Sequence, residues 1–152
     1  MLIVYALVVL FIFRAISRSL LNRLTDADSY IRKAKTLISY FGAKKSAARV
    51  LQRGLELPDN TKEDEDELNF QIGNVYYLMK KYPEAVAYYE KMEERLKTKG
   101  FPFDKGYLHM IMSYYNAGKV EKARAIYHIL MNKRFEDPRF GTVESLLSRI
   151  FK

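Results

Sequence analysis

The chain has 152 residues, of which 49% are hydrophobic and 29% charged, and its formal net charge is +8. This composition is typical of a folded protein with a hydrophobic core and excludes a disordered chain. The sequence contains no cysteine, which excludes a disulfide framework, thiolate metal sites and a cysteine nucleophile. The length leaves room for one compact domain and a short additional segment.

The N-terminal residues 1–13 (MLIVYALVVLFIF) contain no charged side chain, and Arg14, Arg18 and Arg23 follow them at helical spacing. The pattern predicts a membrane-anchor helix over residues 1–24, because basic residues beside an apolar helix are attracted to anionic lipid. The span is short, since a helix needs roughly 20 apolar residues to cross a bilayer core of about 30 Å. The alternative is that this helix packs on the rest of the protein or on a partner.

Charge predicts the orientation of this anchor. Residues 1–58 hold ten Lys and Arg against three acidic residues, and cytoplasmic flanks of membrane spans carry the Lys and Arg excess. A cleaved signal peptide is disfavoured, because the positive charges follow the apolar stretch instead of preceding it. We therefore expect a single-pass protein of the cell membrane with its N-terminus outside and the rest of the chain in the cytoplasm.

From Asp26 onward, helix-like segments alternate with short turns, and the pattern repeats every 38 residues. Equivalent positions are held by Ala47, Ala85 and Ala123, by Leu51, Tyr89 and Tyr127, and by Ile38, Tyr76 and Tyr114. A fourth set consists of Ala34, Ile72 and Met110. Within each predicted helix these positions lie three or four residues apart, which is the spacing of the buried face of an amphipathic helix. Each unit is therefore predicted to form two helices. The turn between them falls at Gly42, Lys80 and Gly118, where glycine ends the first helix in a left-handed conformation.

The second and third units resemble the tetratricopeptide repeat. The small and aromatic residues that carry the resemblance in the second unit are Ile72, Gly73, Tyr76, Tyr82, Ala85 and Tyr89, and those in the third unit are Tyr107, Tyr114, Gly118, Ala123 and Tyr127. The first unit follows the pattern less closely, since Lys35 replaces the usual glycine and Leu51 replaces an aromatic residue. The resemblance covers residues 26–136.

The resemblance implies an all-α fold with a short α-solenoid of three helix pairs, which follows the transmembrane helix that the apolar residues predict. Within a repeat domain of residues 26–152, the predicted units cover residues 26–60, 61–99 and 103–136. A further helix over residues 142–152 is expected to cap the open end of the stack. Its predicted buried face consists of Val143, Leu146, Leu147, Ile150 and Phe151.

Few residues are candidates for chemistry. His109 and His128 have no carboxylate partner at metal-ligand spacing. The acidic residues 63–67 lack the glycine and the residue order of a calcium loop, and they fit the first turn of a helix capped by Thr61. We expect no catalytic residue, no enzyme activity, no metal and no cofactor. Nucleic acid is also not expected as a partner, because the repeat core accounts for most of the twelve tyrosines.

In tetratricopeptide repeats, the first helix of each pair lines a concave groove. The resemblance implies that the partner-binding groove is lined by Arg32, Thr36, Ser39, Phe70, Asn74, Tyr77, Lys105, Leu108, Met112 and Tyr115. This mixture of aromatic, amide and basic side chains is appropriate for an extended peptide or a helix. The alternative is a groove that is only solvated, or one that is filled by the protein's own N- or C-terminal segment.

The sequence therefore predicts a membrane-anchored adaptor or scaffold whose cytoplasmic repeats bind a protein partner, with anionic lipid near the basic flank. The alternative is a permanent structural subunit or assembly factor of a membrane protein complex.

Overall fold

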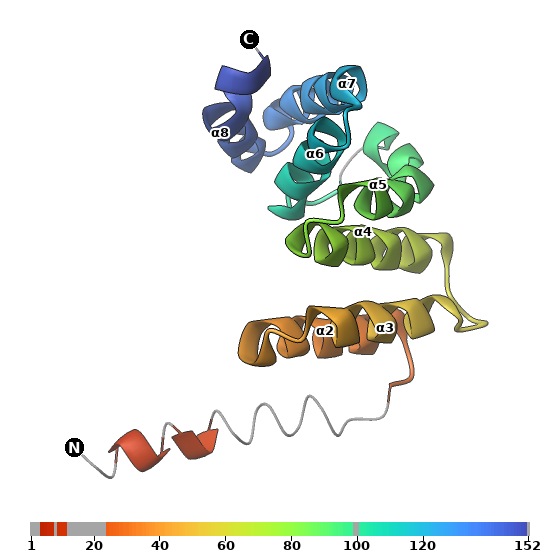
Figure 1. Ribbon diagram of the computed structural model, residues 1–152, viewed down its shortest axis with the longest axis vertical. Helices are drawn as coiled ribbons and strands as arrows, with labels where there is room; N and C mark the ends of the chain where they lie inside the picture. Colours follow the sequence, from red (N-terminus) through yellow and green to blue (C-terminus); the bar gives the residue numbers. More distant parts are fainter. Residues whose placement is uncertain (1–3, 8, 12–23, 99–100, 152) are drawn as a thin grey trace. The chain divides into compact units, whose positions relative to one another are not determined.

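The computed structural model describes residues 4–7, 9–11, 24–98 and 101–151, apart from the side chain of Arg149, and these residues form helices and short connections without a strand (Figure 1). The chain divides into two compact units, Met1–Asp64 and Glu65–Lys152. The all-helical fold that the sequence predicts is thus confirmed.

Unit 1 contains a helix pair, α2 (Ala27–Phe41) and α3 (Lys44–Leu55), which pack against each other. Helix α2 begins at a capping box, in which the Asp26 carboxylate accepts the backbone N–H of Ser29 at 2.8 Å. The facing residues Ala34 and Ala47 are buried, and their small side chains allow the two helices to approach closely.

Unit 2 contains the larger part of α4 (Lys62–Leu78) and all later elements. These are α5 (Tyr82–Lys91), η1 (Glu93–Lys97), α6 (Gly106–Asn116), α7 (Val120–Asn132), η2 (Lys133–Phe135), η3 (Pro138–Phe140) and α8 (Gly141–Phe151). Their buried side chains form one core that includes Tyr89, Met110 and Tyr114, each 0% exposed. Helix α4 begins as predicted, because the hydroxyl of Thr61 accepts the backbone N–H of Asp64 at 3.1 Å.

The turns inside the three helix pairs share one backbone conformation. Gly42, Lys80 and Gly118 have φ angles of 59°, 59° and 79°, so all three lie in the left-handed region. The predicted equivalence of the three turn positions is confirmed. It includes Lys80, whose backbone adopts a conformation that normally favours glycine.

Between α5 and α6, the described residues form η1 and an irregular connection. Arg95 of η1 contacts the Glu67 carboxylate of α4 at 2.7 Å, and Gln71 donates to the same carboxylate at 2.8 Å. Further along, the ring of Phe101 packs edge-on against Phe140 with centroids 5.7 Å apart. These contacts hold Arg95 and Phe101 to the rest of unit 2.

Helix α8 packs on the end of unit 2 with a narrower face than the sequence predicted. Val143, Leu147 and Phe151 are buried, and Phe151 stacks on Tyr127 of α7 with centroids 5.2 Å apart. Leu146 and Ile150, however, are 58% and 37% exposed. The expectation that all five residues share a buried face was wrong. The elements α7 and η3 cover only Val143, Leu147 and Phe151, which follow one another at intervals of four residues.

The anchor predicted for residues 1–24 lies largely outside the described residues, and so do Arg14, Arg18 and Arg23. Residues 4–7 and 9–11 are helical, and their apolar side chains are exposed, Phe11 by 75%. Among the helices that the structure describes, none combines the length and the hydrophobicity that crossing a bilayer requires.

The turn conformation can be tested by exchanging residues between equivalent positions. Lys80→Gly is expected to raise the free energy of unfolding by about 1 kcal/mol, because a left-handed conformation is unfavourable for a residue with a Cβ atom. Gly118→Lys is the matched exchange and is expected to lower it by about the same amount. Urea unfolding followed by circular dichroism measures both. Equal stability of the two variants would contradict the shared turn geometry.

Candidate functional site

The centre of the candidate site is a pair of stacked rings that join α4 to α6. The rings of Tyr77 and His109 have centroids 4.4 Å apart and an interplanar angle of 15°. The Nδ1 atom of His109 lies 3.2 Å from the side-chain oxygen of Asn74. The hydroxyl of Tyr89, on α5, donates a hydrogen bond to the same oxygen at 2.9 Å.

Two glycines allow the helices to come this close. A Cβ atom on Gly73 would lie 2.5 Å from the Tyr89 ring, and one on Gly106 would lie 2.4 Å from the Asn74 amide nitrogen. Because Asn74 and Tyr77 are three residues apart, they share one face of α4. The backbone of α4 and the start of α6 thus set the position of the Asn74 amide.

Burial sets the protonation of this network. Tyr89 is 0% exposed, and burial raises its pKa well above the ordinary value, so that its hydroxyl remains a donor. Burial lowers the pKa of His109, and the negative charge of Asp104 only partly opposes this effect. The imidazole is therefore neutral at pH 7.

The hydrogen bonds also assign the tautomer of His109. The Asn74 oxygen has two lone pairs, one taken by the Tyr89 hydroxyl and one available to an N–H at Nδ1 of His109. A neutral imidazole that carries its proton on Nδ1 has an unprotonated Nε2, which accepts hydrogen bonds. The site can therefore offer an acceptor beside the ring of Tyr77.

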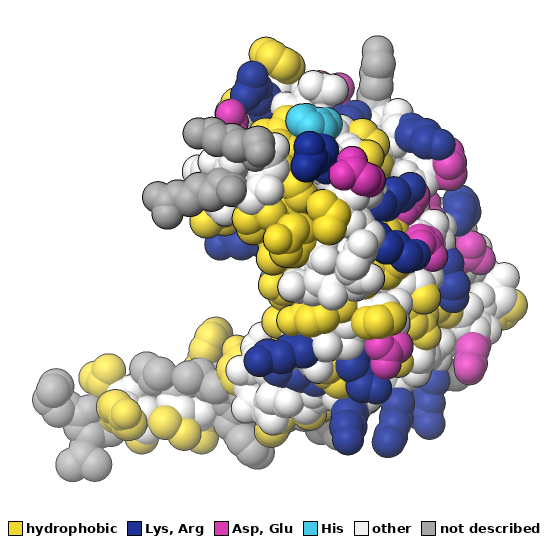
Figure 2. Space-filling model, turned by 45° about the horizontal axis from the view of Figure 1, so that its top comes forward, with side chains coloured by type: hydrophobic (Ala, Val, Ile, Leu, Met, Phe, Trp, Pro, Cys, Tyr) yellow, Lys and Arg dark blue, Asp and Glu magenta, His cyan; other side chains and the backbone are white. Residues whose placement is uncertain are grey.

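Apolar side chains continue from this pair along α6. Leu108 and Met112 are half-buried, and Tyr115 is 38% exposed and meets Phe151 of α8 edge-on at 6.0 Å. The spacing of 108, 112 and 115 places them on one face of the helix. On the face that Figure 2 shows, hydrophobic side chains gather near a histidine, with charged side chains of both signs to one side. We call Tyr77, Leu108, His109, Met112 and Tyr115 the α4–α6 strip.

Some of the predicted groove residues are accessible and others are buried. Tyr77 stacks on His109 of α6, while Leu108, Met112 and Tyr115 share one face of α6 and Lys105 is exposed just before it. Phe70 was wrongly assigned to the groove: it is 2% exposed, and its ring packs against Tyr107 with centroids 4.8 Å apart.

Three predicted groove residues have local partners. Asn74 is only 9% exposed and supports the strip from beneath. In unit 1, Arg32 pairs with Asp28 one turn away on α2, and the hydroxyl of Thr36 donates to the backbone oxygen of Arg32 at 3.0 Å.

Sequence reasoning did not find the contact between Asn74 and His109. These residues are 35 positions apart, and no spacing within one helix indicates their contact. The 38-residue repeat does give an indication of it. The repeat makes His109 of α6 equivalent to Gln71 of α4, and Gln71 lies one turn before Asn74. The sequence identified Tyr89 as a core residue but did not predict the hydrogen bond that its hydroxyl donates to Asn74.

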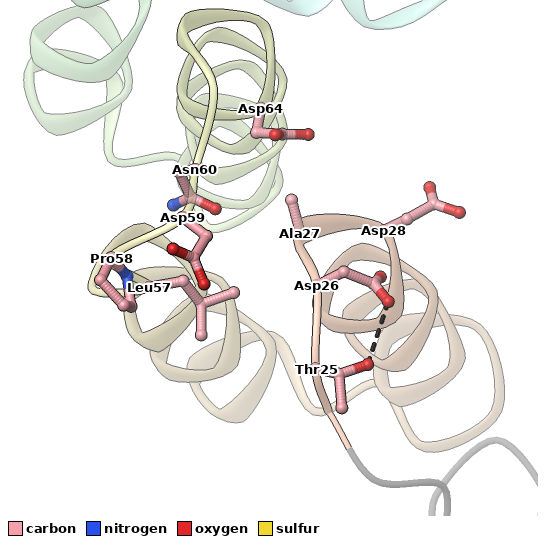
Figure 3. Close-up of a pocket in the computed structure, with 9 residues that line it drawn as sticks. All are labelled: Thr25, Asp26, Ala27, Asp28, Leu57, Pro58, Asp59, Asn60 and Asp64. Atoms are coloured by element: carbon pink, nitrogen blue, oxygen red, sulfur yellow. Dashed lines mark hydrogen bonds between the residues drawn. The ribbon is translucent and has the colours of Figure 1, made fainter.

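Unit 1 contains a pocket of about 190 Å³ at the start of α2 and along residues 57–64 (Figure 3). Its lining residues are Thr25, Asp26, Ala27, Asp28, Leu57, Pro58, Asp59, Asn60 and Asp64. Hydrogen bonds from Ser29 and from Thr61 lower the pKa values of Asp26 and Asp64, respectively. These two carboxylates are thus engaged in capping α2 and α4.

The lowered pKa of His109 predicts a pH dependence of stability. In the unfolded chain His109 takes up a proton as the pH falls through about 6.5, whereas the folded protein takes it up only at lower pH. The unfolded state then binds more protons, so the free energy of unfolding falls between pH 7 and pH 5. Thermal unfolding at both pH values should show a smaller fall for His109→Gln. The exposed His128 provides the control, and an equal effect of His128→Gln would contradict the assignment.

Comparison with known proteins supports the repeat assignment in unit 2. Residues 67–95 and 106–134 match the model of the tetratricopeptide repeat. The first segment runs from α4 into η1 and the second from α6 into η2, whereas the α2–α3 pair lies outside both. No curated protein and no solved structure matches the chain. The two matches support the assignment of the second and third helix pairs to the tetratricopeptide repeat family.

Proposed function

We propose that the α4–α6 strip binds a segment of a protein partner. Tetratricopeptide repeats generally mediate protein–protein interaction, which supports binding as the function of unit 2. The observation that carries the proposal is the stack of Tyr77 on His109, held from below by Asn74. It gives the strip a rigid aromatic centre that is only partly buried.

The contacts of the strip favour a peptide or a helix as the ligand. Aromatic residues and Met are enriched in the buried centres of protein interfaces. The Nε2 atom of His109 adds one acceptor, which can receive a backbone N–H of an extended segment. Since stacking and the hydrogen bond to Asn74 order Tyr77 and His109 before binding, little side-chain entropy is lost when the partner arrives.

We further propose that this binding takes place at the cytoplasmic face of the cell membrane. The uncharged residues 1–13, followed by Arg14, Arg18 and Arg23, support attachment through residues 1–24. The exposed apolar side chains at residues 4–7 and 9–11 require a nonpolar environment that the described part of unit 1 does not supply. Anionic lipid headgroups would neutralise the three arginines.

A permanent subunit of a membrane complex is the second candidate. Exposed apolar side chains at the end of unit 2 favour it: Phe135 is 81% exposed, and Leu146 and Ile150 are also exposed. Purification in mild detergent distinguishes the two functions. A stoichiometric complex that survives high salt indicates a permanent subunit, whereas a partner that dissociates and depends on Tyr77 indicates an adaptor.

The binding proposal predicts that Tyr77→Ala weakens partner capture. The full-length protein is used as bait in detergent-solubilised membranes, and captured proteins are quantified by mass spectrometry. Loss of a central aromatic contact is expected to reduce affinity by tenfold or more, on the order of 1.4 kcal/mol. The control is Val120→Ala, which trims an exposed apolar side chain that belongs neither to the strip nor to the apolar set at the end of unit 2. Unchanged capture by Tyr77→Ala, with intact helical content, would contradict the proposal.

A further inference from the structure

The outer face of α3 carries a row of positive side chains. Lys45, Arg49 and Arg53 recur every four residues, and all three are exposed. On the helix they lie opposite Ala47 and Leu51, which are buried. Helix α3 contains no acidic residue, so this face has one sign of charge along its length.

The stability of α3 does not account for these charges. Its first turn contains Lys44 and Lys45, where the positive end of the helix dipole favours acidic residues. The N-cap residue, Ala43, offers no side-chain hydrogen bond. The neighbouring helix α2 shows the opposite and favourable pattern, since it begins with the capping box of Asp26 and with Asp28 in its first turn.

Intramolecular ion pairs do not account for the charges either. Within the part of the chain that the structure describes, Lys45, Arg49 and Arg53 have no ion-pair partner. In unit 2, several surface lysines do have acidic partners: Lys119 contacts Glu90 at 2.7 Å, for example. The positive face of α3 is thus available to an external anion.

Two exposed aromatic side chains come shortly before the first residue of α3. Tyr40 and Phe41, the last residues of α2, are 57% and 56% exposed. The two-residue turn Gly42–Ala43 separates them from the lysines that begin α3. Aromatic rings beside Lys and Arg are typical of segments that lie in the interface between a bilayer and water.

We propose that α3 and the α2–α3 turn form a membrane contact of their own. Lys45, Arg49 and Arg53 lie against the headgroups of an anionic bilayer, and Tyr40 and Phe41 enter the interface. A bilayer is favoured over nucleic acid because unit 1 also exposes aliphatic side chains at residues 4–7 and 9–11, which a nucleic acid cannot bury. This contact adds to the proposed attachment through residues 1–24 and does not require that segment to span the bilayer.

The charges set the size of the effect. Each Lys or Arg near an anionic surface strengthens membrane partition about fivefold, so the three together contribute about a hundredfold. Salt weakens the contact, since the screening length is only about 8 Å at physiological ionic strength.

A label on α3 tests the contact directly. The chain has no cysteine, so Ser46→Cys, on the exposed side of α3, provides a single attachment site for a fluorophore. The labelled full-length protein is reconstituted with vesicles of phosphatidylcholine, alone or mixed equally with phosphatidylglycerol. We expect acrylamide, an uncharged quencher in the water, to quench the label less in the anionic vesicles, and high salt to remove the difference.

Charge variants make the test specific. The triple variant Lys45→Gln, Arg49→Gln, Arg53→Gln should lose the protection in anionic vesicles. A control that removes the same charge from exposed positions of unit 2 should keep it: Lys80→Gln, Lys91→Gln, Arg124→Gln. Circular dichroism checks that both triple variants keep their helical content.

Three results would overturn the proposal. The first is equal quenching in both kinds of vesicle, and the second is an equal loss of protection in the control triple variant. The third is protection by duplex DNA without protection by vesicles, which would make nucleic acid the partner of α3. Sedimentation with phosphatidylcholine vesicles reports attachment through residues 1–24 separately, so failure of the two membrane contacts can be distinguished.

Discussion

The side-chain oxygen of Asn74 connects three helices of unit 2. It accepts a hydrogen bond from Tyr89 of α5 and lies within hydrogen-bond distance of His109 of α6, while Asn74 itself belongs to α4. Leaving a buried polar group without a partner costs about 1–3 kcal/mol, so the amide favours one arrangement of these helices. The arrangement requires glycine at positions 73 and 106, since a side chain on Gly73 would overlap Tyr89 and one on Gly106 would overlap Asn74.

This network determines what the surface of unit 2 presents. By holding His109 in place, Asn74 also fixes the ring of Tyr77 that stacks on it, and both rings remain partly accessible. The proposed binding strip is therefore a consequence of core packing. Unit 1 differs, because the positive face of α3 has no such role in packing; it is the surface that we propose contacts the membrane.

The sequence predicted the features that depend on local periodicity. The helix pairs follow from the spacing of buried residues, and the turn at Lys80 follows from its equivalence to Gly42 and Gly118. The sequence placed Phe70 on the surface and Leu146 in the core, whereas the structure shows the reverse. Neighbouring positions on a helix differ in direction by about 100°, and the elements that cover them are distant in sequence. For the same reason the contact between Asn74 and His109 was not found.

The tautomer of His109 tests the central network most directly. Two-bond proton–nitrogen correlation spectra of the ¹⁵N-labelled protein at neutral pH distinguish the two ring nitrogens. The hydrogen bond to Asn74 predicts a neutral imidazole whose proton is on Nδ1, and replacement of Asn74 by alanine should shift the population toward the Nε2 proton. A proton on Nε2 in the unmodified protein, or a charged ring at neutral pH, would contradict the network.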